Sequence, residues 1–174
     1  KIYVAGLNWK MNNLLLFTHS FPYTKEEKTF LETEIIHLSE KFEKVFIFPR
    51  NFNQKIETKL PDNVRVFHHE IYYPFNRIKT LRRNFLLVIK VFMLELILSK
   101  DRFKYFKVGF RALNNLLLFI NNADRLKTEM EGMEIKGNII CYSYWFAIWG
   151  NILPILKYKS ANIKKIVTRA HGYD

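Results

Sequence analysis

The sequence predicts an α/β fold in which a parallel sheet carries helices on both faces, and two observations predict it. Residues 14–17 and 45–48 are short, unbroken apolar runs, which are typical of strands buried on both faces. The segment between them has helical periodicity, and the alternation of strand and helix returns later in the chain. A strand, a helix and a strand in this order form a parallel pair with a right-handed crossover. The sequence contains no internal repeat and no linker, so one domain is expected over residues 11–174.

The first helix is predicted after residues 18–23, a proline-containing segment that ends the first strand. Thr24 and Glu27 have the spacing of a capping box, which marks a helix start. Apolar residues then recur at helical intervals on one face: Leu31, Ile35, Leu38 and Phe42. The glutamates of this helix are expected to form a solvated face: Glu26, Glu27, Glu32 and Glu34. Glu27 is also close enough to the preceding loop to reach the edge of the sheet.

Three further strands are expected from the same signals, at residues 63–67, 138–142 and 164–168. Residues 72–83 are predicted to be an irregular basic connection between the third strand and the helices that follow it.

Two helical regions are expected in the second half of the chain. The first runs from residue 84 to about residue 130 and is expected to be divided at residues 99–101 and again at Asn121 and Asn122. The second covers residues 145–158, with Pro154 as a candidate kink.

The composition fits a folded domain with a substantial core. Of the 174 residues, 49% are hydrophobic and 25% are charged, which argues against disorder. The single cysteine, Cys141, excludes a disulfide framework and has no second thiol for a metal site, so a reducing, cytoplasmic compartment is expected. The most apolar run, residues 85–98, is shorter than the roughly 20 residues of a membrane-spanning helix and contains Lys90 and Glu95. A buried or interfacial helix is therefore expected there.

The net charge of +12 and the pI near 9.8 imply attraction to polyanions. Much of the charge lies in one region: Arg77, Lys79, Arg82, Arg83, Lys90, Lys100, Arg102, Lys104, Lys107 and Arg111. Aromatic residues are interleaved with these: Phe85, Phe92, Phe103, Tyr105, Phe106 and Phe110. Two interpretations are open, a solvated basic face on a helical pair or a surface that rests on anionic lipid at the inner face of the cytoplasmic membrane. A nucleic-acid partner is not expected, because no recognition module accompanies the charge.

Polar and aromatic residues follow three of the predicted strands. They are His19, Ser20 and Tyr23 after the first strand, Ser143, Tyr144 and Trp145 after the fourth, and Arg169, His171 and Asp174 after the fifth. Ligands of open α/β sheets bind outside the carboxyl ends of the strands, so these three loops are expected to line one rim. These residues also have structural explanations: His19 beside Pro22 could shape a turn, the aromatic pair could close a core, and Arg169 and Asp174 could pair with each other on the surface.

His171 is the strongest single candidate for chemistry. Gly172 beside it lets backbone approach closely, and an imidazole can donate or accept a hydrogen bond near neutral pH. Other reaction types lack their motifs, since the chain has no glycine-rich phosphate loop and no Gly-x-Ser-x-Gly elbow. His68 and His69 are adjacent on a strand and face opposite sides, and no metal site is expected.

Three segments resemble landmarks of one enzyme family, in the same order and near the expected spacing. Residues 14–35 (LLLFTHSFPYTKEEKTFLETEI) resemble the opening of bacterial family 4 glycosyltransferases of the capsular and colanic acid type. There an apolar strand leads through a proline-containing loop into a helix with a Glu-x-x-Phe-like start. Residues 143–145 and 169–174 resemble two further landmarks, and the set spans nearly the whole chain.

The resemblance implies the N-terminal, acceptor-binding half of a GT-B enzyme, in which two Rossmann-like domains face each other across a cleft. Such an enzyme transfers a sugar from a nucleotide-sugar donor to a saccharide or lipid-linked acceptor, with retention of configuration and in general without a metal or other cofactor. It implies a catalytic role for His171 and a cleft role for the flanking set: His19, Ser20, Tyr23, Glu27, Tyr144, Trp145, Arg169 and Asp174. The donor would be held mainly by a second domain after residue 174, so this chain alone is expected to be inactive. The alternative is a basic α/β module that binds a membrane surface or nucleic acid without catalysis.

Residues 4–12 resemble the first strand of triosephosphate isomerase, including the Asn-x-Lys context of its catalytic lysine. The match ends within a dozen residues, whereas a (β/α)₈ barrel needs about 250. The first ten residues also lack the pattern of a secretory signal. We interpret residues 1–10 as a leader or an expression remnant and assign no role to Lys10.

Overall fold

Five parallel strands form one sheet in the computed structural model, which describes residues 12–51, 56, 58–68, 74–98, 102–133, 135 and 137–169. The strands are β1 (Asn12–Thr18), β2 (Lys44–Pro49), β3 (Val64–Val66), β4 (Asn138–Ser143) and β5 (Ile163–Thr168). Their order in the sheet is β3-β2-β1-β4-β5, and every pair of neighbours is parallel. The predicted strands and the Rossmann-like α/β class are thus confirmed. The interpretation of residues 1–10 concerns residues outside the described ranges.

The central strand is β1, and all seven of its residues are buried. Leu15 lies opposite Phe46 of β2 on one side and Cys141 of β4 on the other. A strand with neighbours on both edges and helices on both faces has no solvated side. Its unbroken apolar sequence follows from that position.

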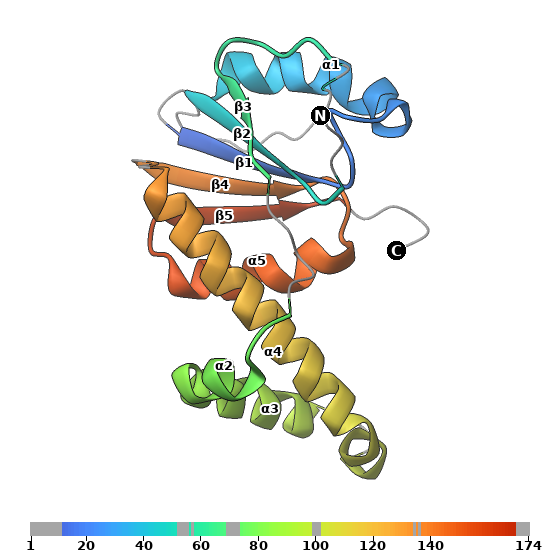
Figure 1. The fold of residues 1–174 in the computed structure, drawn as a ribbon, viewed down its shortest axis with the longest axis vertical. Helices are drawn as coiled ribbons and strands as arrows, with labels where there is room; N and C mark the ends of the chain where they lie inside the picture. Colours follow the sequence, from blue (N-terminus) through green and yellow to red (C-terminus); the bar gives the residue numbers. More distant parts are fainter. Residues whose placement is uncertain are drawn as a thin grey trace.

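Helices cover both faces of the sheet, as predicted. The helix α1 (Lys25–Lys41) lies on one face, and α4 (Arg102–Gly132) and α5 (Ala147–Lys159) lie on the other (Figure 1). Alternate residues of β1 point to the two faces. One buried cluster joins Leu14 and Leu16 to Leu31 and Ile35 of α1, and the other joins Leu15 and Phe17 to Leu126 of α4 and Trp149 of α5. Each such side chain contributes roughly 1.5–3 kcal/mol by leaving water.

A helical arm extends beyond the sheet, and we use this name for α2 (Arg77–Arg83), α3 (Phe85–Leu98) and the part of α4 that packs on them (Figure 1). The helix α2 corrects the prediction of an irregular connection over residues 72–83. It begins where the Asn76 side chain accepts a hydrogen bond from the backbone N–H of Lys79, at 2.9 Å. With only Ile78 and Leu81 as apolar residues, its seven positions are too few to show helical periodicity.

The predicted break at Asn121 and Asn122 is wrong, because α4 runs without interruption from Arg102 to Gly132. The Asn122 side chain is buried and its amide nitrogen donates to the Leu118 carbonyl one turn earlier, at 2.8 Å, so this N–H group is bonded within the helix. The other predicted break, residues 99–101, lies outside the described residues, between the end of α3 and the start of α4. Pro154 lies inside α5, on its exposed side.

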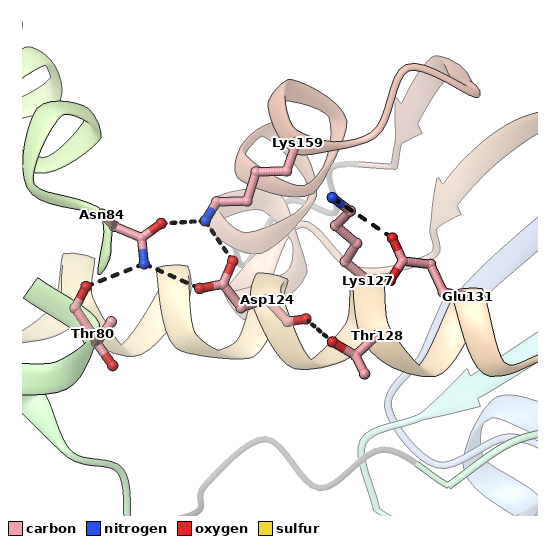
Figure 2. Close-up of polar contacts among 7 residues, drawn as sticks. All are labelled: Thr80, Asn84, Asp124, Lys127, Thr128, Glu131 and Lys159. Carbon is pink, nitrogen blue, oxygen red and sulfur yellow. Dashed lines mark hydrogen bonds and ion pairs between the residues drawn. The ribbon is translucent and has the colours of Figure 1, made fainter. Parts of the chain in front are cut away.

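A polar junction ties the arm to the rest of the domain (Figure 2). Lys159 of α5 donates to Asp124 of α4, with 2.5 Å between Nζ and Oδ1, and also to the Asn84 side-chain oxygen. Asn84, between α2 and α3, donates in turn to the second Asp124 oxygen and to the Thr80 carbonyl, both at 3.1 Å. The side chains of Lys159 and Asp124 are only 13% and 15% exposed. A shielded ion pair, together with the Asn84 side chain, therefore joins α2, α4 and α5.

None of the helices in the described part of the chain combines the length and the apolar character that crossing a membrane requires.

Candidate functional site

One carboxylate organises the loop that follows β1. Glu27, in the first turn of α1, is buried and accepts hydrogen bonds from three consecutive backbone N–H groups. The His19 N–H donates to Oε1 at 3.1 Å, and the N–H groups of Ser20 and Phe21 donate to Oε2 at 2.6 and 2.7 Å. We call this arrangement the Glu27 clasp. It fixes the backbone of residues 19–21 at the carboxyl edge of the sheet.

The clasp replaces the predicted capping box. Thr24 is the residue before α1, as expected, but its side chain makes no capping hydrogen bond. Its hydroxyl lies 2.6 Å from the Ser20 hydroxyl, and Glu27 reaches the preceding loop. Glu27 therefore does not belong to a solvated face, which corrects one part of the sequence interpretation.

The loop after β4 joins the same carboxylate. The Trp145 indole N–H donates to Glu27 Oε1, and the Trp145 carbonyl accepts from the Ser143 hydroxyl. The backbone N–H of Tyr144 donates to the Phe17 carbonyl at 2.9 Å, which holds this loop against the end of β1. Two segments more than a hundred residues apart in sequence thus share one buried acceptor.

A second polar cluster lies beside the clasp and includes the residue after β5. The Arg169 guanidinium stacks over the Tyr144 ring, with 5.1 Å between Cζ and the ring centroid, and its Nη1 lies 3.8 Å from Glu34 Oε2. The Tyr142 hydroxyl donates to Glu34 Oε1 at 3.1 Å. Burial raises the pKa of Tyr142 and of Tyr144, and the Glu34 carboxylate raises the pKa of Tyr142 further. Both phenols therefore stay protonated at neutral pH.

Two histidines complete the edge on the β2 and β3 side. The exposed His19 ring lies with Nε2 3.0 Å from the Asn51 side-chain nitrogen, and the Asn51 backbone N–H donates to the His19 carbonyl at 2.7 Å. Tyr23 is buried, and its hydroxyl lies 3.3 Å from His68 Nε2. The loop after β2 is thereby attached to the loop after β1.

The predicted rim residues that the structure describes lie at one edge of the sheet: His19, Ser20, Tyr23, Glu27, Tyr144, Trp145 and Arg169. His171 and Asp174 lie outside the described residues. Sequence reasoning missed several participants, namely Glu34, Asn51, His68 and Tyr142. A signal for Glu34 exists, because it follows Glu27 by seven residues and so projects from the same side of α1 two turns later.

The rim offers hydrogen-bonding groups and aromatic surface but no metal site among the described residues. Glu27 receives five donors, because the Ser20 hydroxyl also lies 3.3 Å from Oε2, and its two oxygens are thereby used. Its contacts favour a positioning role. The exposed groups are the His19 imidazole and the Arg169 guanidinium, beside the half-buried Trp145 indole. Such a set can bind hydroxyl groups and pack against the apolar face of a ring.

No protein-family model, no curated protein and no solved structure matches the chain. The sheet topology and the contacts at its edge define the class of this protein, a Rossmann-like α/β domain with a polar, aromatic rim at the carboxyl edge of its sheet.

Proposed function

We propose that this chain is the acceptor-side domain of a retaining glycosyltransferase, which moves a sugar from a nucleotide-sugar donor to a saccharide or lipid-linked acceptor. The donor would be held mainly by a second, facing domain of the GT-B type, and the chain by itself would be inactive. No metal or cofactor has a role in the proposal, because the nucleotide sugar is a substrate. A cytoplasmic location fits the single, buried thiol of Cys141.

The observation that carries the proposal is the joining of the three segments that resemble the family. The first two meet where Trp145 donates to Glu27, and the second meets the third where Arg169 stacks on Tyr144. These segments are far apart in sequence, and the parallel sheet brings them to one edge, where their side chains contact each other. An acceptor site needs such a meeting, since one sugar must be contacted by several loops at once.

The proposed roles follow from exposure and charge. His19 and Ser20 lie on the clasped loop, where the exposed imidazole can hydrogen-bond an acceptor hydroxyl. Arg169 adds a positive charge that suits a developing anion or a phosphate on a lipid-linked acceptor. His171, two residues further on, is proposed to orient the acceptor or the transferred sugar as a neutral imidazole.

The test is a transfer assay on the complete gene product with radiolabelled UDP- and GDP-sugars and membranes that contain lipid-linked acceptors. We expect His171→Ala to reduce transfer at least about 100-fold, which is typical of losing a positioned catalytic group. Glu27→Gln replaces one acceptor oxygen by an amide that cannot accept from the loop, so we expect about a 10-fold loss with a raised KM for the acceptor.

The control is Ile36→Ala, since Ile36 is an exposed residue of α1 without a contact to the rim in the described structure. Its transfer rate should equal that of the parent. The proposal fails if the parent transfers none of the sugars tested, or if His171→Ala transfers at the parental rate.

A further inference from the structure

The positive charge of this chain is concentrated in the stretch of sequence that contains α2, α3 and the start of α4. Residues 77–111 contain ten basic and two acidic residues, a net charge of +8 out of the +12 of the whole chain. The other 139 residues together carry only +4. In α2, the four basic residues are exposed, and no acidic residue accompanies them: Arg77, Lys79, Arg82 and Arg83. The arm therefore attracts anionic partners far more strongly than the sheet does.

The arm also exposes most of the large apolar side chains that face solvent in the described structure. Eight of the thirteen such residues belong to α2 and α3: Ile78, Phe85, Leu86, Ile89, Met93, Leu94, Ile97 and Leu98. Leu86 is 82% exposed, Ile97 is 63% exposed, and Met93 lies between them in sequence at helical spacing. We call the row formed by Leu86, Met93 and Ile97 the α3 stripe. On the opposite side of α3, Val88 packs against Leu117 and Ile120 of α4.

These two properties occur in the same place, at the end of the molecule farthest from the sheet (Figure 1). The α3 stripe continues directly from the basic helix α2, because only Asn84 separates the two helices. The polar junction at Asn84 fixes where they sit, through Asp124 and Lys159 (Figure 2). The basic helix and the apolar row that follows it in sequence are thus attached to the domain at one point.

We propose that α2 and α3 dock this protein on an anionic membrane, with α3 lying in the plane of the interface. The basic residues would contact lipid phosphates while the α3 stripe enters the acyl boundary. With 14 residues, α3 is about 21 Å long at 1.5 Å per residue, which is shorter than the roughly 30 Å hydrocarbon layer. The proposal does not depend on the proposed transferase function, which concerns the carboxyl edge of the sheet.

The charge argues against the other occupants of this surface. A symmetric dimer through the α3 stripe would bring two strongly basic segments together, since residues 77–111 of each copy carry a net charge of +8, and like charges repel. A nucleic acid would satisfy the charge but leave the exposed apolar row in water. An anionic lipid surface complements both properties at once.

The test is flotation of the chain with vesicles of phosphatidylcholine alone or with about 30% phosphatidylglycerol. We expect binding to the anionic vesicles that weakens as NaCl rises from about 0.1 to 0.5 M. Arg82→Gln with Arg83→Gln should weaken binding about 30-fold, since each basic residue near the surface contributes about a factor of five. Leu86→Ser with Ile97→Ser should weaken it about 30-fold or more through lost apolar contact.

Matched controls lie on α1, on the other side of the sheet. Phe30 and Ile36 are 62% and 48% exposed, so Phe30→Ser with Ile36→Ser removes comparable apolar surface, and it should bind like the parent. The exposed pair Lys25 and Lys41, changed to glutamine, is the matching charge control. The proposal is overturned if either control weakens binding as much as its partner in the arm.

A fluorophore on Met93→Cys reports depth, because the native Cys141 is fully buried and is not labelled. Its emission should shift to the blue with anionic vesicles, whereas the same label on Phe30→Cys should not shift. A blue shift without vesicles, together with dimers in sedimentation, would assign the stripe to a second copy and overturn the proposal. The proposal would also be overturned if the chain did not float with vesicles but bound single-stranded DNA tightly, and if Leu86→Ser with Ile97→Ser left that DNA binding unchanged.

Discussion

The centre of the sheet and the helical arm contain the same kinds of residues in opposite surroundings. Residues 14–17 of β1 are 0–1% exposed, whereas Leu86 and Leu98 of α3 are 82% and 77% exposed. The central strand has partners on both edges and both faces, but α3 packs mainly on α4. An apolar run therefore has two meanings. In β1 the apolar side chains are buried in the core, and in α3 many of them stay exposed to solvent after folding.

The largest expected effect tests this difference with one substitution made twice. Leu15→Ala should lower the free energy of unfolding by about 3–4 kcal/mol, because it leaves a cavity in a close-packed core. Leu86→Ala should change it by less than about 0.5 kcal/mol, because the side chain is already in water. Urea unfolding followed by circular dichroism measures both. Equal losses would show that α3 is buried in solution and would remove the contrast.

The polar junction attaches the arm to the domain, so removing its carboxylate should have the next largest effect. Asp124→Ala should cost about 3 kcal/mol, because it leaves the shielded Lys159 ammonium without its carboxylate. Adding Lys159→Met should recover at least half of that loss. Hydrogen exchange of the α3 amides should rise in the single variant and fall again in the double variant.

The control is Glu131→Ala, which breaks the ion pair of Glu131 with Lys127 on the same helix (Figure 2). These side chains are 66% and 40% exposed and 3.7 Å apart, so the loss should stay below about 0.5 kcal/mol. A loss as large as that of Asp124→Ala would mean that burial does not distinguish the two pairs.

The smallest effect concerns alkaline pH and the cluster beside the clasp. Burial raises the pKa of Tyr142 and Tyr144 above the ordinary value of 10.0, so the unfolded chain loses these protons at lower pH than the folded chain. Their contribution to stability is complete below pH 10 and is lost as pH rises beyond it. Urea unfolding at pH 9, 10 and 11 should show the decline, and Tyr142→Phe should reduce its slope. An unchanged slope would mean that Tyr142 ionises as easily in the folded protein as in the unfolded chain.

The sheet was predictable from sequence because its strands are consecutive apolar runs bounded by turns, a pattern that few other structures produce. The helix α2 was not, because seven residues rich in arginine carry almost no periodicity. The uninterrupted α4 was missed at Asn122 because a buried asparagine can bond to the preceding turn instead of ending it. Each of these two helices contains or begins at an asparagine whose side chain bonds to the helix backbone, Asn76 for α2 and Asn122 for α4.

For the candidate site, too, one part could be predicted from sequence and another could not. The topology of a parallel sheet predicts which loops meet, and the described loops do meet at one edge. The Glu27 clasp could not be predicted, since its donors are backbone N–H groups whose directions depend on the conformation of residues 19–21. Glu34 was assigned to solvent because its partners, Tyr142 and Arg169, come from distant strands.

The clasp has one more consequence, for how this rim can change. Its three loop donors are main-chain N–H groups, which every residue except proline possesses. The side chain of His19 is exposed and takes no part in holding the loop to Glu27. At position 19 the backbone N–H belongs to the clasp, whereas the exposed imidazole lies beside the Asn51 side chain. Any residue except proline at position 19 keeps this donor to Glu27, so a substitution there can change the exposed side chain of the rim while the clasp keeps its three N–H donors.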